Sequence, residues 1–84
     1  MTTNLERLME RVGDLGATII LKVDGERGPE DAGRWTFVVS GGSLAEQGPI
    51  RIDSPSLHEC LARGLALLRA RGDEWHWIDE FTVP

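Results

Sequence analysis

The sequence has little of what several functions require: one cysteine, two histidines, no tyrosine, and nine lysines and arginines against fourteen acidic residues. Because Cys60 stands alone, no internal disulfide can form, and stability must come from packing. The net charge of −5 disfavours binding to a phosphate backbone, which requires clustered cations. No stretch approaches the roughly 18 apolar residues of a membrane span, and the polar N-terminus is unlike a signal peptide. We therefore expect a cytoplasmic protein that contacts neither nucleic acid directly nor a membrane.

The length of 84 residues allows one domain with a modest core. An apolar content of 40% and a charged content of 27% are typical of a folded domain. No internal repeat or linker divides the chain. Residues 1–84 are therefore interpreted as a single domain.

Residues 1–16 have the pattern of an amphipathic helix. Thr3 and Glu6 have the spacing of a capping box, in which each side chain accepts a hydrogen bond from a free backbone N–H at the start of the helix. Apolar residues then recur every three or four positions, which predicts one buried stripe. Gly16 is well placed to end the helix. The predicted stripe consists of Leu5, Leu8, Met9, Val12 and Leu15.

Residues 17–53 contain three segments with the period of two that is typical of a β-strand. Three strands are predicted, at "ATIILKVD", "RWTFVVS" and "IRID". The turns between them are rich in glycine, proline and acid, and their length suits an antiparallel meander. The residues expected to face the core are Ile19, Leu21, Val23, Trp35, Phe37, Val39, Ile50 and Ile52.

Residues 54–72 predict a second helix. Ser56 and Glu59 repeat the capping-box spacing, and Gly72 is placed to end the helix. The order α-β-β-β-α predicts an α+β fold, in which a three-stranded antiparallel sheet is packed on one face by two helices. An aromatic and acidic tail, residues 73–84, follows. The apolar face of the helix comprises Leu57, Cys60, Leu61, Gly64, Leu65, Leu67 and Leu68.

The sequence offers no arrangement of residues that suits catalysis or a metal. His58 and Cys60 lie two positions apart on a helix and point to different sides, so they do not form a ligand pair. Cys60 is interpreted as buried apolar filler. The loop "DGERGPED" lacks the spacing of a calcium loop. We expect no catalytic residues, no metal and no cofactor, hence a protein that is not an enzyme.

The excess negative charge is confined to two segments. Residues 24–31 contain four acids and one base, and residues 73–80 contain four acids and no base. Trp75 and Trp77 lie within the second segment, and the sequence leaves open which is core and which is interface. An extended tail would place both on one side, beside Asp79 and Phe81. The predicted partner-binding residues are Asp24, Glu26, Glu30, Asp31, Asp73, Glu74, Trp75, Trp77, Asp79 and Glu80.

Three resemblances bear on these features. The α-β-β-β-α order is similar to double-stranded-RNA-binding domains, but "SPSLHECLARG" has no lysine where that family binds phosphates. In size, acidity and element order the chain resembles small phage-encoded anti-CRISPR proteins, some of which mimic nucleic-acid charge. Residues 17–71 are similar to the HicB-type antitoxin core, although "SGGSLAEQGP" replaces that family's proline-glycine-cysteine loop. No residue roles carry over from these families.

The leading functional hypothesis is a non-enzymatic inhibitor that binds a basic, nucleic-acid-handling surface of a partner protein. An antitoxin or immunity-type protein that caps a small toxin is the first alternative. A domain whose acidity serves only solubility is the second. We expect a monomer, or a homodimer that forms through an edge strand of the meander.

Overall fold

The computed structural model describes residues 4–81 and has the predicted order of helices and strands. The fold class, an α+β domain with the order α-β-β-β-α, is confirmed. The tail adds a helical element that was not predicted. The elements are α1 (Leu5–Asp14), β1 (Ala17–Val23), β2 (Trp35–Gly41), the 3₁₀ helix η1 (Gly42–Leu44), β3 (Ile50–Ser54), α2 (Leu57–Arg69) and the 3₁₀ helix η2 (Asp73–Glu80).

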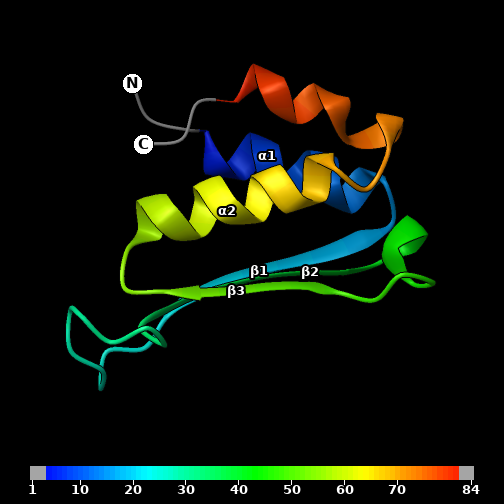
Figure 1. The fold of residues 1–84 in the computed structure, drawn as a ribbon. Helices are drawn as coiled ribbons and strands as arrows, with labels where there is room; N and C mark the ends of the chain where they lie inside the picture. The colour runs from blue at the N-terminus through cyan, green and yellow to red at the C-terminus, as the bar shows by residue number, and fades with distance from the viewer. Residues whose placement is uncertain (1–3, 82–84) are drawn as a thin grey trace.

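The three strands form one antiparallel sheet in the order β1-β2-β3. Figure 1 shows three layers, with the sheet on one side, α1 and α2 packed against one of its faces, and η2 lying across the outer side of the helices. No helix of the described residues covers the second face of the sheet. One face of the sheet therefore belongs to the core and the other is open.

Each helix begins at a residue whose side chain caps it. Asn4 accepts a hydrogen bond from the Arg7 N–H at 3.1 Å, so Asn4 is the cap of α1; the predicted cap, Thr3, lies outside the described residues. Ser56 caps α2 as predicted, accepting from the Glu59 N–H at 3.2 Å. The Glu59 carboxylate accepts from the Ser54 hydroxyl at 2.9 Å, and this hydroxyl accepts from the Ser56 N–H at 3.2 Å. Ser54 thus joins the end of β3 to the start of α2.

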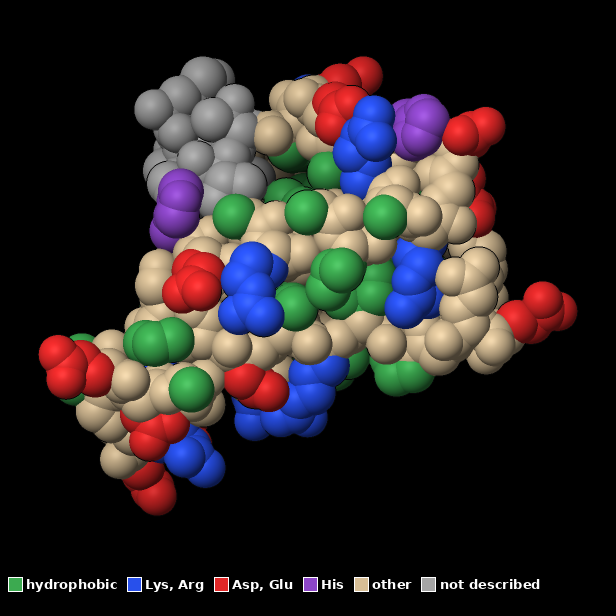
Figure 2. Space-filling model, in the orientation of Figure 1, with side chains coloured by type: hydrophobic (Ala, Val, Ile, Leu, Met, Phe, Trp, Pro, Cys, Tyr) green, Lys and Arg blue, Asp and Glu red, His purple; other side chains and the backbone are tan. Residues whose placement is uncertain are grey.

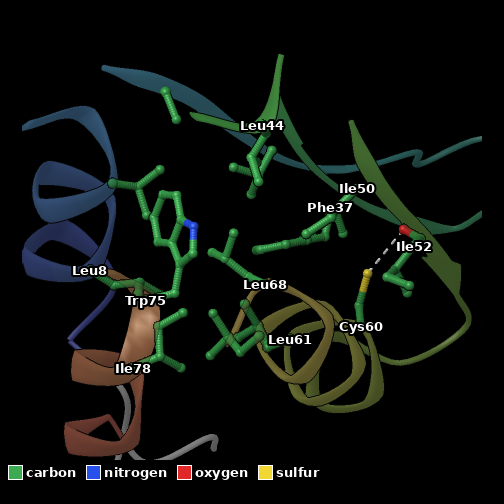
Figure 3. Close-up of a cluster of buried hydrophobic side chains, with 14 residues drawn as sticks. Leu8, Phe37, Leu44, Ile50, Ile52, Cys60, Leu61, Leu68, Trp75 and Ile78 are labelled. Atoms are coloured by element: carbon green, nitrogen blue, oxygen red, sulfur yellow. Dashed lines mark hydrogen bonds between the residues drawn. The ribbon is translucent and has the colours of Figure 1, made fainter. Parts of the chain in front are cut away.

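The core lies between the sheet and the two helices, and η2 closes it on the far side (Figure 3). Phe37, Val39, Ile50 and Ile52 of the sheet are buried as predicted, and so are Leu8, Val12, Leu61, Leu65 and Leu68 from the helices. Trp35 is only partly buried, and Val23, which was predicted to face the core, is 48% exposed at the end of β1. Two residues predicted for the apolar stripes are instead exposed. Leu15 follows the end of α1 and is 38% exposed, and Leu67 faces away from the sheet and is 48% exposed.

Candidate protein-binding surface

The acidic tail is helical, whereas the sequence left open whether it is strand, helix or irregular. The alternating sides that an extended segment would have do not apply to it. η2 has about three residues per turn, which places residues three apart above one another. Trp75 and Ile78 are buried on one side, and Phe81 continues that side partly buried against the core. The acids fall on the remaining sides and are exposed. Burial of one residue in three therefore explains why this segment coils.

Trp75 is a core residue, which corrects its assignment to the partner-binding surface. Its side chain is fully buried and lies among Leu8, Leu44 and Leu68, between α1 and α2 (Figure 3). The indole N–H has no hydrogen-bond partner among the described residues. Burial of so large a ring stabilises the contact between η2 and the helices, but it leaves Trp75 inaccessible to a partner.

Trp77 is partly buried and packs against α1. The Arg11 guanidinium lies 4.4 Å from the centre of the Trp77 ring. The Phe81 ring packs edge to face against Trp77, with 5.6 Å between the two ring centres. Arg11 also forms an ion pair with Glu80 at 3.0 Å. The side chain of Trp77 is thus enclosed by residues of its own chain, so it is a poor candidate for the predicted exposed aromatic anchor.

The four carboxylates of η2 have different environments. Asp79 accepts a hydrogen bond from Arg69 at 2.6 Å, which holds the pKa of this carboxyl below its usual value. Glu80 is paired with Arg11, as above. Asp73 lies 3.3 Å from the His76 ring nitrogen, its one ion-pair partner among residues 4–81, and its side chain is 99% exposed. Within residues 4–81 neither Asp73 nor Glu74 contacts an arginine or lysine. The start of η2 therefore carries the least neutralised charge of this segment.

The acids of the loop between β1 and β2 serve mainly to hold the loop together. Arg27 forms ion pairs with Asp24 at 3.2 Å and Asp31 at 3.3 Å. Both carboxylates also accept backbone N–H groups of the same loop, from Glu26 to Asp24 and from Gly33 to Asp31. Glu26 and Glu30 are exposed and form no ion pair with a described residue. Glu26 and Glu30 are therefore the acids of this loop whose charge is not neutralised by an ion pair with a described residue.

The two acidic segments do not form one surface. Figure 1 places the loop beyond one end of the sheet, whereas η2 lies on the outer side of the helices. In Figure 2 the acidic side chains are scattered over the visible face, with arginine or lysine side chains among them. The predicted partner-binding residues of 24–31 and of 73–80 therefore lie on different parts of the molecule.

A shallow hollow on the open face of the sheet was not anticipated from the sequence. It has a volume of about 340 Å³, and Thr36, only 3% exposed, is one of its lining residues. Asp53 accepts hydrogen bonds from Arg51 at 3.1 Å and from the Thr36 hydroxyl at 2.7 Å, and these bonds, the one from Arg51 first, lower the pKa of Asp53. Strand alternation would have placed these side chains outward, but the register that aligns them required the structure. The lining comprises Lys22, Asp24, Arg27, Ala32, Gly33, Thr36, Arg51 and Asp53.

Cys60 is buried as predicted, and its thiol lies 3.4 Å from the Ile52 carbonyl oxygen. Burial raises the pKa of this thiol. Among residues 4–81 no three side chains of histidine, cysteine, aspartate or glutamate are grouped so that they could hold a metal ion. In the same part of the chain, no helix has both the length and the apolar character required to cross a bilayer.

The chain was compared with known families, proteins and structures, and no relative was found. No protein-family model, curated protein or solved structure matches the chain. The functional argument therefore depends on the surface described above.

Proposed function

We propose that this domain is a non-enzymatic inhibitor that docks through the outer face of η2 on a basic, nucleic-acid-handling surface of a partner protein. The proposal does not include the acidic loop, which lies elsewhere on the molecule. The single observation that carries it is the start of η2, where Asp73 and Glu74 are exposed and contact no described cation.

The anchoring of η2 supports a docking role. Because Trp75 and Ile78 are buried, the carboxylates are held in place before a partner arrives. A pre-ordered surface loses less conformational entropy on binding than a loose tail. The four acids and the two arginines that pair with them, Arg11 and Arg69, leave a local charge of −2. Such an excess favours a cationic partner and speeds encounter.

The structure decides which substitutions test this proposal. Reversing Asp79 or Glu80 would place a lysine beside an arginine and would disturb the attachment of η2. Asp73→Lys with Glu74→Lys changes the charge without breaking an arginine pair. Glu26→Lys with Glu30→Lys makes the same change of net charge in the loop and is the matched control. Both double variants should keep the far-ultraviolet circular dichroism of the wild type.

The assay uses the three proteins as baits for nuclease-treated lysate of the native host. Wild type and the Glu26/Glu30 variant should retain the same basic protein, and the Asp73/Glu74 variant should not. Raising the salt concentration should release it, since charges that face solvent are screened over about 8–10 Å. The purified domain should then reduce nucleic-acid binding by the retained protein. Equal retention by all three baits would refute η2 as the docking surface, and retention of a small toxin would instead favour an immunity-type role.

A further inference from the structure

The outer edge of β1 presents main-chain groups that have no partner in the described chain. The Asp24 N–H donates to the Arg34 carbonyl at 2.7 Å, and these two residues are opposite each other in the β1–β2 register. In an antiparallel ladder, directly bonded pairs alternate with pairs whose N–H and C=O groups point away. The residues of β1 that point away from β2 are therefore Ala17, Ile19, Leu21 and Val23.

The opposite edge of the sheet differs in length and charge. β3 has five residues, and the two whose main chain points outward are Arg51 and Asp53. A short edge strand with charged side chains resists pairing with another chain. β1 has seven residues, and Lys22 is its only charged one. β1 is therefore the edge that remains open to an added strand.

Exposed apolar side chains gather at the same edge. Four large apolar side chains are exposed in the described chain, and Leu67 is the one that lies on α2. The other three lie on or beside β1: Ile20 is 50% exposed, Val23 is 48% exposed, and Leu15 precedes the strand. An open strand with apolar side chains is a common site for sheet extension.

We propose that β1 pairs with β1 of a second copy, antiparallel across a two-fold axis that passes beside Ile20. The result is a continuous six-stranded sheet with one β1 beside the other at its centre. In this register Ala17 is opposite Val23 of the second copy, and Ile19 is opposite Leu21. All four outward-pointing residues of each strand are then bonded.

The side chains of β1 are self-complementary in this register. Ile20 meets Ile20 of the second copy on the open face of the sheet, so each covers the other. Lys22 is opposite Thr18, and no like charges are paired. A register centred on Ile19 would place Val23 opposite Leu15, which precedes the strand. A register centred on Leu21 would place Ala17 opposite Gly25, which follows it. In each case one end of β1 has no strand residue opposite it. This match of length, main-chain phase and side chains favours a second copy over an unrelated strand.

The oligomeric state of the intact chain tests the inference. Sedimentation equilibrium over a concentration series should give twice the chain mass of 9.3 kDa for the wild type. Ile20→Lys places two like charges opposite each other and removes the apolar contact, so the dissociation constant should rise by about 100-fold or more. Leu67→Lys changes a side chain of similar exposure on α2 and should keep the dimer.

The register is tested by cross-linking. Opposed residues of a non-bonded antiparallel pair have Cα atoms about 4.5 Å apart, within the range of a disulfide. Ile20→Cys should therefore form an intermolecular disulfide under mild oxidation, while the buried Cys60 does not take part. Thr18→Cys, on the same face of the same strand, should not cross-link to itself, because it is opposite Lys22.

Three results would overturn the inference. They are a wild type that is monomeric at every concentration, a dimer that survives Ile20→Lys, and equal cross-linking of the two cysteine variants. Val38→Lys separates edge pairing from stacking of the open faces, since Val38 lies on the central strand of that face. Loss of the dimer in a folded Val38→Lys variant would also overturn it. Neither proposal depends on the other, because η2 and β1 lie in different layers.

Discussion

Replacing Gly64 by alanine should destabilise the protein, although the same change usually stabilises a helix. Gly64 lies buried in the middle of α2, over the ring of Phe37. A Cβ atom at this position would lie 2.4 Å from Cδ2 and 2.6 Å from Cε2 of that ring. Carbon atoms in contact are normally about 3.5–4.0 Å apart, so the ring or the helix must move by about 1 Å. Phe37 is fully buried, which leaves the ring little room.

Two opposing effects determine the magnitude. Alanine is favoured over glycine inside a helix by about 0.5–1 kcal/mol. Overpacking of a close-packed core costs about 1–3 kcal/mol, and the short distance to Phe37 argues for the upper part of this range. We expect the free energy of unfolding to fall by about 1–2 kcal/mol, which lowers the melting temperature by roughly 4–15 °C in a domain of this size.

Urea unfolding followed by tryptophan fluorescence measures this change, because Trp75 becomes exposed on unfolding. Gly13→Ala in α1 is the matched control. No atom lies within 4 Å of the Cβ it would add, and its φ is not in the left-handed region. This variant should be more stable than the wild type by up to about 1 kcal/mol.

A stabilised Gly64→Ala variant would refute the argument that the helix and the sheet are in direct contact here. The double variant with Phe37→Leu provides a second check, because the smaller side chain makes room for the added methyl group. The two substitutions should then be less destabilising together than the sum of their separate effects. Strict additivity would indicate that the two residues do not touch.

Two further predictions concern η2. Trp75→Ala should lower the free energy of unfolding by about 3–5 kcal/mol, since it removes a fully buried ring, whereas Trp77→Ala should cost less; parallel urea titrations compare them. The hydrogen bond from Arg69 lowers the pKa of Asp79 in the folded state. The ionised Asp79 carboxylate therefore stabilises the fold at pH values above the pKa that Asp79 has in the unfolded chain, and this stabilisation is lost as the pH falls below about 4. Asp79→Asn should reduce this part of the pH dependence, and an unchanged profile from pH 3 to 6 would contradict it.

The secondary structure was largely predictable because its signals are local. The alternation of inward Phe37 and Val39 with outward Thr36 and Val38 depends only on the geometry of a strand. The cap at Ser56 depends on residues three positions apart, and the structure confirms it. Even so, the start of α1 was misplaced, since Asn4 is also a good cap and stands next to the predicted one.

The tail shows where local signals were insufficient. "DEWHWIDEF" fits both an alternating strand and a helix with three residues per turn. The choice depended on the space between α1 and α2, which Trp75 and Ile78 fill only when the segment coils. That space is formed by residues from distant parts of the chain. No pattern within the tail could have revealed it.

The charges illustrate the same limit. Composition gives the excess of acid, and the order of the residues gives its confinement to two segments. The pairing of Glu80 with Arg11 joins residues 69 positions apart, and the separation of the loop from η2 follows from how the layers stack. Coulomb interactions depend on distance in space, whereas capping and alternation depend on distance along the chain. For this reason the elements could be predicted from the sequence, but only the tertiary structure showed which carboxylates remain available to a partner.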